Sequence, residues 1–429
     1  MREMKDSGIE WIGEIPKHWK CCKQKYGLTL LNGRAFKESE FLEDGKYKVL
    51  RVGNLFTNPI WHYSNLMLED NKYCQKGDLL YSWSMSYAPF IWSGDKVIYH
   101  YHIWKVLIDD ILCKKFVYYY LLALTEALYA EIHETTMGFI TMGIMNNSYL
   151  PYCNLEEQQQ IANFLDTQCS EIDATAEDIQ KEISLLEEYK KSVITEAVTK
   201  GLNPDTEMKD SGIEWIGEIP KHWKVVRLEF LSWVRARLGW KGLKADEYVD
   251  EGYPFLSAFN IQDSKIKWEA MNFITKERFD ESPEIMLACG DVLLLKDGAG
   301  VGKCARIDSL PKGDSTVNSS LAVITCFDNL NYRYLYYSFN SSFFSNLINL
   351  KLNGMGVPHL TQEELRKFIV LLPCVKEQQQ IADYLDTKCS EIDILIADKK
   401  RQLDILADYK KSLIYEYVTG KKEVPVKDF

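Results

Sequence analysis

A glycine-rich stretch with a lysine near its end, LLLKDGAGVGKCARI at 293–307, has the composition of a phosphate-binding loop. A nucleotide-binding loop of that kind reads G-x-x-x-x-G-K-[ST], because its backbone N–H groups hold the phosphates and its hydroxyl binds Mg²⁺. Here Asp297 stands at the first glycine position, and Cys304 follows Lys303. We therefore interpret the stretch as a glycine turn that joins two strands, and not as a nucleotide site.

Two histidines, His100 and His102, stand two residues apart in a run typical of a β-strand, so both side chains lie on one face. They could bind a metal ion, but no third ligand can be placed from the sequence. A half-buried pair of strand histidines is the plainer interpretation, and contact with a nucleic acid is the other. The sequence also lacks zinc-type Cys and His spacing, an N-P-P-Y amino-methyltransferase motif, a cofactor-binding glycine motif and a Ser, His and Asp grouping. We expect the chain alone to be catalytically silent.

Several polar and basic side chains are of the types that contact bases and phosphates. In LRVGNL, Arg51 and Asn54 suit guanine and adenine edges, although a turn asparagine is the plainer alternative. The most basic short stretch, WVRARLGWKGLK at 233–244, suits either phosphate contact or a solvated loop. In YSWSMSY at 81–87, strand alternation would place about half of the side chains in the core. The candidate nucleic-acid contacts of this kind are Arg51, Asn54, Ser82, Trp83, Ser84, Tyr87, His100, His102, Arg235, Arg237, Lys241, Lys244, Ser257, Asn260, Asn318, Lys351 and Asn353.

The net charge of −11 argues at first against nucleic-acid binding, which needs local Lys and Arg. The acidity is concentrated, however, because residues 154–204 hold eleven Asp and Glu against four Lys and Arg, whereas 207–373 hold 22 against 20. A near-neutral segment can still display a basic face, so the net charge neither indicates nor excludes nucleic-acid binding. The length of 429 residues, the 46% hydrophobic content and the short apolar runs indicate a soluble, cytoplasmic protein of two or three domains with no membrane span.

The elements that must position these residues are present twice. EMKDSGIEWIGEIPKHWK occupies 3–20 and, without one substitution, 207–224. EQQQIANFLDTQCSEID at 157–173 returns as EQQQIADYLDTKCSEID at 377–393, and YKKSVITEAVT at 189–199 returns as YKKSLIYEYVT at 409–419. The chain therefore reads as an identical opener, a variable middle and a near-identical closer, followed by the same three parts again.

The closers carry apolar residues at heptad spacing, which predicts two long helices that pack along a seam. In the first closer, Leu165, Ile172 and Ile179 fall seven apart, and Gly201 and Pro204 end the pattern. The second closer repeats the seam and ends at Gly420. Because a globular middle separates them, an antiparallel pair would place the two middles at opposite ends of the helices.

The middles differ in their polar residues but share a skeleton of short β-type runs. YKVLRVGNL at 47–55 parallels YPFLSAFNI at 253–261, KGDLLYSWS at 76–84 parallels CGDVLLLKD at 289–297, and HYHIWKVLI at 100–108 parallels NSSLAVITC at 318–326. Aromatic-rich helical stretches follow, then Met137-Gly138 and Met355-Gly356. We expect two diverged copies of one α+β domain.

This doubled order of opener, variable region, Leu-Pro and EQQQIA helix resembles the specificity subunit of type I restriction-modification systems, over essentially the whole chain. The resemblance implies an α+β, pseudo-two-fold protein with two target recognition domains on small twisted β-sheets, separated by two long antiparallel coiled-coil helices. The expected divisions are a first recognition domain at 1–153, a helical spacer at 154–204, a second recognition domain at 205–374 and a second helical spacer at 375–429.

The resemblance also implies partners. Each recognition domain would read one half of an asymmetric, two-part double-stranded DNA target, and the helices would dock two methyltransferase subunits, joined by restriction and translocase subunits. The glycine turn at 293–307 would belong to the second recognition domain and could approach the DNA, which makes Lys296, Asp297 and Lys303 further candidate contacts. S-adenosylmethionine, ATP and Mg²⁺ would be used by those partners and not by this chain. Two alternatives stay open: a scaffold that binds partner subunits without reading DNA, and a self-contained DNA methyltransferase or nuclease.

Overall fold

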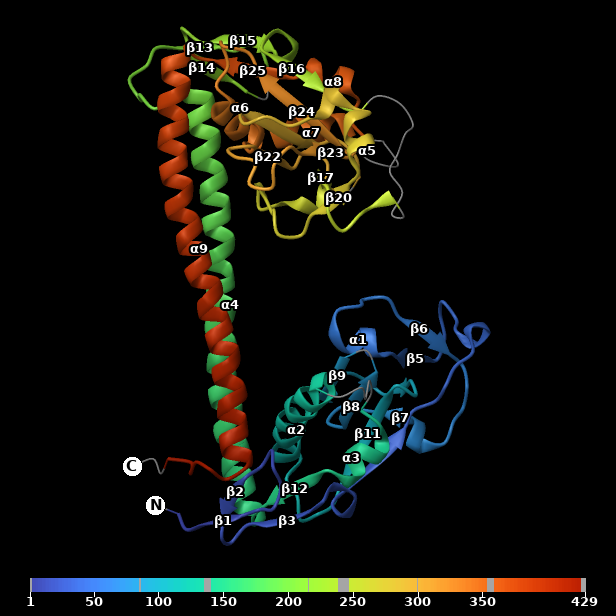
Figure 1. Cartoon of the computed structure of the whole chain (residues 1–429). Coiled ribbons are helices and arrows are strands. Elements are labelled where there is room, and N and C mark those ends of the chain that lie inside the picture. Colours follow the sequence, from blue (N-terminus) through green and yellow to red (C-terminus); the bar gives the residue numbers. More distant parts are fainter. Residues whose placement is uncertain are drawn as a thin grey trace. The chain divides into compact units, whose positions relative to one another are not determined.

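The computed structural model describes residues 2–84, 86–134, 140–214, 216–237, 247–298, 300–352 and 359–425. The chain forms two compact units, which are Met1–Gln180 together with Arg401–Phe429, and Lys181–Lys400. We call them the first and the second unit. Figure 1 labels their helices and strands, which follow a similar order in both.

Each copy of the opener forms a small β-hairpin. Strands β1 (Met4–Asp6) and β2 (Glu14–Pro16) pair antiparallel in the first unit, and β13 (Met208–Asp210) and β14 (Glu218–Pro220) pair in the same register in the second. Trp19 and Trp223, which follow the hairpins, are fully buried. The openers therefore anchor each unit to its core.

The first unit holds two four-stranded sheets, in the orders β4-β11-β8-β9 and β6-β5-β10-β7, and a two-stranded sheet β12-β3. Its strands are β3 (Lys20–Lys23), β4 (Leu28–Asn32), β5 (Tyr47–Leu50), β6 (His62–Ser64), β7 (Tyr73–Cys74), β8 (Leu79–Ser84), β9 (Ser86–Ile91), β10 (Val97–Tyr99), β11 (Ile103–Ile108) and β12 (Tyr149–Tyr152). Its shorter helices are α1 (Val52–Phe56), α2 (Lys114–Glu134) and α3 (Met142–Asn147). Apolar residues of α2 pack on β8 and β11, so this helix covers one face of the β4-β11-β8-β9 sheet.

The second unit repeats this plan with sheets in the orders β16-β24-β21-β22 and β20-β17-β23, a two-stranded sheet β15-β25 and a hairpin β18-β19. Its strands are β15 (Lys224–Arg227), β16 (Ser232–Arg235), β17 (Tyr253–Leu256), β18 (Ile261–Gln262), β19 (Lys265–Ile266), β20 (Asn272–Ile274), β21 (Asp291–Leu295), β22 (Cys304–Arg306), β23 (Thr316–Val317), β24 (Leu321–Cys326) and β25 (Ile369–Leu372). Its shorter helices are α5 (Lys276–Asp280), α6 (Tyr332–Phe339), α7 (Ser342–Leu352) and α8 (Gln362–Arg366). Helices α6 and α7 pack on the sheet as α2 does in the first unit.

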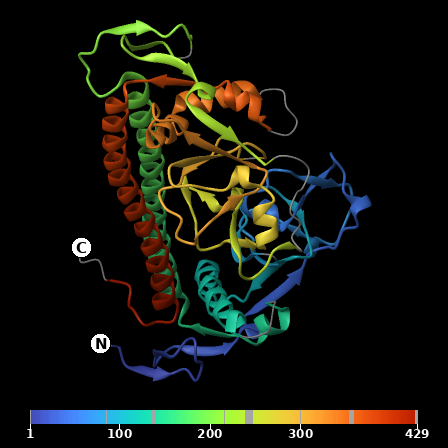
Figure 2. The ribbon, with the colours of Figure 1, turned by 45° about the horizontal axis from the view of Figure 1, so that its top comes forward.

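Two long helices, α4 (Leu155–Lys200) and α9 (Val375–Val418), contribute to both units. Within each unit they lie side by side (Figure 1, Figure 2). They are antiparallel there, because the α9 partner moves back along the chain as the α4 residue moves forward. In the first unit Phe164 packs on Tyr417 and Asp173 pairs with Lys410 at 2.6 Å. In the second unit Glu182 pairs with Lys399 and Lys190 pairs with Asp393, each at 2.5 Å. The heptad residues Leu165, Ile172, Ile179, Leu385 and Ile392 are buried, so the predicted seam is confirmed.

Local chain conformation explains where these helices end. Gly201 and Gly420, directly after the last helical turns, have φ of 77° and 71°, the left-handed region that glycine adopts without a steric cost. A Cβ at Gly420 would also lie 2.5 Å from Pro16 Cδ, so the helix end and the opener meet at a point that only glycine fits. The predicted α+β class, the doubled plan and the long antiparallel helices are confirmed. The Met137-Gly138 and Met355-Gly356 pairs lie outside the described residues.

Candidate nucleic-acid interface

In the first unit, one edge of the sheets collects four of the candidate residues. Strands β5 and β10 are parallel, so their carboxyl ends meet, and Arg51 and His100 follow directly after them. His100 N donates to Leu50 O at 2.9 Å. At the same edge the end of β8 meets the start of β11, where Trp83 N donates to His102 O at 3.1 Å.

The second unit builds the same edge with the same backbone bonds. Strands β17 and β23 are parallel, and Ser257 and Asn318 follow directly after them. Asn318 N donates to Leu256 O at 2.8 Å, and Lys296 N donates to Ser320 O at 2.8 Å. We call these four positions of each unit its reading edge: Arg51, Trp83, His100 and His102 in the first unit, and Ser257, Lys296, Asn318 and Ser320 in the second.

The first reading edge is aromatic. The Trp83 ring stacks on Trp104 with centroids 5.6 Å apart, and its Nε1 donates to Tyr101 O at 2.8 Å. The rings of His100 and His102 lie 4.9 Å apart. Burial, then His102 and the Arg51 guanidinium, lower the pKa of His100 to about 4, and burial followed by Arg51 also lowers the pKa of His102. Both rings are therefore neutral near pH 7, and each offers one donor and one acceptor.

The second reading edge is polar and internally bonded. Asn318 Oδ1 accepts from Ser320 N at 3.1 Å and from Ser320 Oγ at 2.6 Å. Lys296 Nζ lies 2.6 Å from Asp297 Oδ2, and the other oxygen of Asp297 contacts His359 Nδ1. The two units thus present different chemistry on one backbone frame.

Four other candidate side chains are buried or hydrogen-bonded within the protein. Arg235 is only 7% exposed and bonds to Asp291 at 2.8 Å, so its guanidinium is not available to phosphate. Asn54 donates to the Ile60 carbonyl and Asn260 to the Ala270 carbonyl, each at 2.8 Å, so the turn-asparagine alternative accounts for both. Ser82 is fully buried, because β8 is covered on both faces from Leu79 to Ser82.

The remaining candidates are scattered. Lys303 is exposed, Arg237 and Ser84 are half-buried, and Tyr87 stacks edge-on against Tyr129 with centroids 5.5 Å apart. Lys241, Lys244 and Asn353 lie outside the described residues, as does the side chain of Lys351.

The sequence interpretation missed Ser320 and His359. Ser320 could have been found by aligning NSSLAVITC with HYHIWKVLI, which places it opposite His102. His359 carried no local signal, because its partner Asp297 is 62 residues away in the chain.

The glycine-rich stretch is a turn between strands, as predicted. β21 and β22 pair antiparallel, with Leu294 opposite Cys304. Gly302 has a φ of 95°, and a Cβ there would lie 2.5 Å from Ile348 Cδ1 of α7, so the turn needs glycine for both conformation and space.

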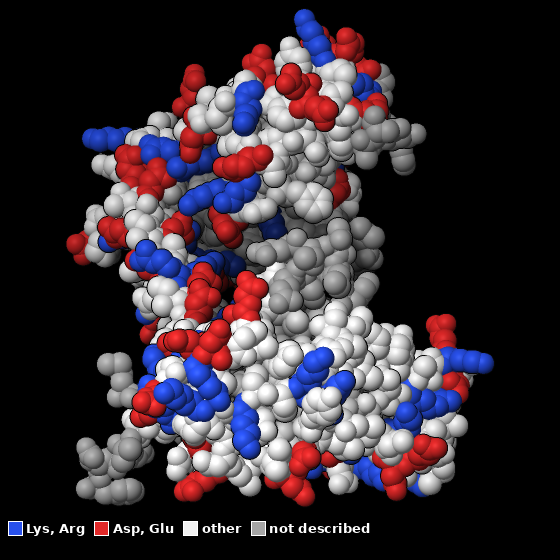
Figure 3. Space-filling model, turned by 60° about the horizontal axis from the view of Figure 1, so that its bottom comes forward, with Lys and Arg blue, Asp and Glu red and all other residues white. Residues whose placement is uncertain are grey.

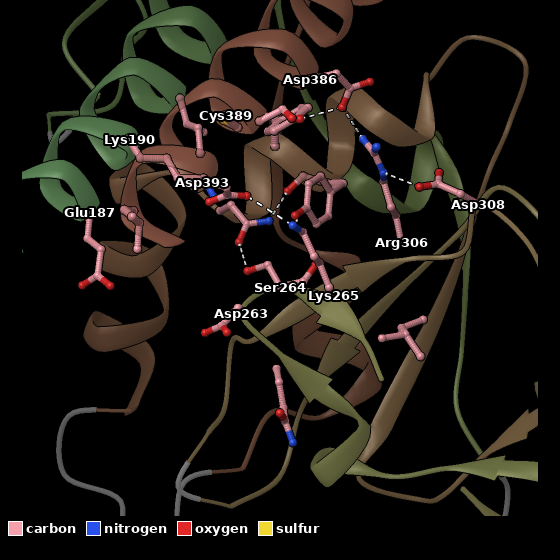
Figure 4. Close-up of a pocket in the computed structure, with 18 of the residues that line it drawn as sticks. Glu187, Lys190, Asp263, Ser264, Lys265, Arg306, Asp308, Asp386, Cys389 and Asp393 are labelled. Atoms are coloured by element: carbon pink, nitrogen blue, oxygen red, sulfur yellow. Dashed lines mark hydrogen bonds and ion pairs between the residues drawn. The ribbon is translucent and has the colours of Figure 1, made fainter. Parts of the chain in front are cut away.

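A cavity of about 880 Å³ lies within the second unit, between the β18-β19 hairpin and the long helices. Figure 4 shows Ser264 and Lys265 of the hairpin facing Lys190, Asp386 and Asp393 of the helices. Both aspartates already have partners within the unit. Asp393 contacts Lys190 and Lys265. Asp386 accepts hydrogen bonds from Arg306, Arg333 and Tyr337, each at 2.6 Å. The Lys190–Asp393 bond joins the two long helices, and the other bonds attach β19, β22 and α6 to α9 within the second unit.

Surface charge is mixed. Figure 3 shows one face on which Lys and Arg stand beside Asp and Glu in small groups. In the described parts of the chain no group of three or more His, Cys, Asp and Glu could hold a metal ion. Among the helices that the structure describes, none is long and apolar enough to cross a membrane.

The family model of the type I restriction modification DNA specificity domain matches this chain twice, at residues 16–185 and 220–404. Among curated relatives, the type I restriction enzyme MjaVIII specificity subunit of Methanocaldococcus jannaschii is 27% identical over 91% of this chain and 86% of its own length. The EcoBI specificity subunit of Escherichia coli is 20% identical over 89% of this chain and 81% of its own length.

A solved structure described as showing complex assembly and conformational transition of the type I R-M system contains a similar chain. The similarity has a TM-score of 0.69 at 14% identity and covers 95% of this chain and 99% of that one. At this identity the likeness supports the fold.

Proposed function

Since the chain belongs to the type I restriction modification DNA specificity family, we propose that its two reading edges each select one half of an asymmetric, two-part DNA target. The observation that carries this proposal is the repeated frame. The same two backbone hydrogen bonds hold three of the four positions in each unit, and the fourth position, Arg51 or Ser257, directly follows the leucine that accepts one of these bonds. The side chains at all four positions differ between the units.

A recognition surface needs a rigid backbone and variable side chains, because base contacts discriminate only when they are held in place. The first edge offers neutral imidazoles, an indole and an arginine, which suit base edges and thymine methyl groups. The second offers hydroxyl and amide groups, which suit hydrogen bonding in the major groove. Different chemistry in the two units favours two different half-targets.

The long helices supply the surfaces for partner subunits. Leu185 and Tyr189 of α4 in the second unit are 63% and 58% exposed, and Ile405 and Tyr409 of α9 in the first unit are 59% and 50% exposed. Each pair is four residues apart, so its side chains share one face of the helix, and the pairs are repeat equivalents. Each pair docks one copy of the same partner, a methyltransferase subunit.

Catalysis belongs to those partners. The family is one of specificity subunits and not of catalytic ones. S-adenosylmethionine would be used by the methyltransferase subunits, and ATP and Mg²⁺ by restriction subunits that join them. The purified chain, mixed with S-adenosylmethionine and DNA but no partner, should show no turnover, and measured turnover would favour a self-contained methyltransferase.

Single-molecule methylome sequencing of cells that carry this chain with its methyltransferase partner tests the proposal. We expect one two-part motif with unlike halves. Exchange of residues 21–150 for the corresponding domain of a relative should alter one half only. Methylation without any motif would favour the scaffold alternative, and a change in both halves would contradict separate reading edges.

A further inference from the structure

We infer that His359 is a base-reading residue of the second half-target, where its Nε2 accepts a hydrogen bond from the exocyclic amino group of an adenine or a cytosine. This inference rests on the proposed function, since it presumes that the second unit reads DNA. It concerns a residue outside the four reading-edge positions.

The backbone places His359 beside the reading edge. Asp297 and His359 form an antiparallel β-bridge, and Leu360 N donates to Lys296 O at 2.8 Å. Lys296 therefore bonds on one side to Ser320, within the reading edge, and on the other to the segment that carries His359. The imidazole stands one strand away from the edge.

Asp297 fixes the orientation of the ring. Its Oδ1 contacts His359 Nδ1, and its Oδ2 contacts Lys296 Nζ at 2.6 Å. An ionised carboxylate only accepts hydrogen bonds, so Nδ1–H is the donor and Nε2 is left as the acceptor of the neutral ring. The His359 side chain is 52% exposed, so Nε2 can reach a ligand.

Lys296 helps to position the carboxylate of Asp297 that orients the His359 ring. Its side chain is only 12% exposed and its charge is matched by Asp297, so it is a poor phosphate contact. It holds Asp297 in place, as second-layer partners of a binding group do. The exposed member of the three is His359.

The hydrogen-bond acceptor at His359 Nε2 determines which bases this residue could recognise. In the major groove, adenine and cytosine present amino donors where guanine and thymine present carbonyl acceptors. His359 would therefore distinguish adenine from guanine, or cytosine from thymine, at one position of the second half-target.

The test uses the complex of this chain with its methyltransferase partner and a library of DNA targets, with the relative affinity measured at each base. His359→Ala should lower discrimination at one position of one half by about tenfold, the usual worth of one hydrogen bond, and leave the other half unchanged. Replacing that adenine or cytosine by an analogue without the amino group should weaken binding of the unaltered complex but not of His359→Ala.

His222→Ala is the matched control. His222 is 53% exposed in the same unit and also contacts a carboxylate, Glu377, at 2.8 Å. It should change neither half. His359→Phe, which keeps a ring but has no hydrogen-bond acceptor, is the second variant in case the alanine variant fails to fold.

The outcomes separate the two proposals. If the unaltered complex selects no two-part target, the proposed function fails. If it selects one, and both His359 variants keep the discrimination of the second half, or weaken all positions equally, the assignment of His359 is overturned while the proposed function stands.

Discussion

The indole Nε1 of Trp223 donates to Glu377 Oε1 at 3.0 Å, across 154 residues of chain. The first unit repeats the bond between Trp19 and Glu157 at 3.2 Å. In both units the tryptophan is the next-to-last residue of the opener, and the glutamate stands in the first turn of a long helix. The two openers therefore make the same contact with the starts of the two long helices.

Replacement of this tryptophan by phenylalanine should destabilise either unit. Trp223→Phe and Trp19→Phe each keep most of the buried ring but leave a part-buried carboxylate without one donor, at a cost of about 1–2 kcal/mol. Urea unfolding followed by circular dichroism measures the loss. Trp233→Phe is the control, because Trp233 is 51% exposed and its replacement should change stability by less than about 0.5 kcal/mol.

Loss of the aspartate in a Gly-Asp pair that both units carry should destabilise the second unit more than the first, because in the second unit this aspartate forms the buried Arg235–Asp291 ion pair. Both units carry a Gly-Asp before a central strand, and Asp78 pairs with Lys105 at 2.7 Å where Asp291 pairs with Arg235. Asp291 is fully buried, so Asp291→Ala strands a buried guanidinium and should cost about 3–5 kcal/mol.

Asp78→Ala is the matched comparison for that variant. The Asp78 side chain is 19% exposed, so water can reach the lysine left behind and the cost should be clearly smaller. Thermal unfolding of the two variants side by side gives the comparison. Equal losses would mean that burial does not determine the cost of breaking these pairs.

The sequence predicted what short segments determine. Heptads, helix-ending glycines and paired strand runs depend on near neighbours, and the equivalence of Arg51 with Ser257 followed from aligned skeletons. Contacts between residues far apart in the chain could not be predicted in this way. Arg235 looked like part of a basic loop because its partner Asp291 is 56 residues away, and His359 went unnoticed for the same reason.

Acidification should weaken the first unit through His100. In the folded chain the pKa of His100 is lowered from 6.5 to about 4, so the unfolded chain binds a proton at a pH where the folded chain does not. The stabilising effect is complete above about pH 6.5 and is lost as the pH falls toward 4. His102 acts in the same direction.

Unfolding free energies between pH 7.5 and 4.5 measure this effect. His100→Asn should make the dependence shallower over this range, because asparagine does not titrate. The lowered pKa values of Glu157 and Asp386 also reduce stability at acid pH, but they contribute equally in both proteins and cancel in the comparison. An unchanged slope would show that His100 is not kept neutral by the fold.

The last prediction concerns the repeated apolar pairs on the long helices. If each pair docks one copy of the same partner, Leu185→Ser with Tyr189→Ser should reduce the number of bound methyltransferase subunits from two to one. Ile405→Ser with Tyr409→Ser should do the same, and all four changes together should abolish assembly. Loss of two apolar anchors weakens a contact by about 2 kcal/mol or more, which native mass spectrometry at micromolar concentration detects as altered stoichiometry.

Ile394 and Leu395 supply the control, since they are 60% and 50% exposed on α9 but have Ala174 and Thr175 at the repeat-equivalent positions. A surface that serves two identical partners must be present twice, and this one is not. Ile394→Ser with Leu395→Ser should therefore leave two partners bound. Loss of a partner in this control, or two partners retained in the fourfold variant, would place the docking surface elsewhere.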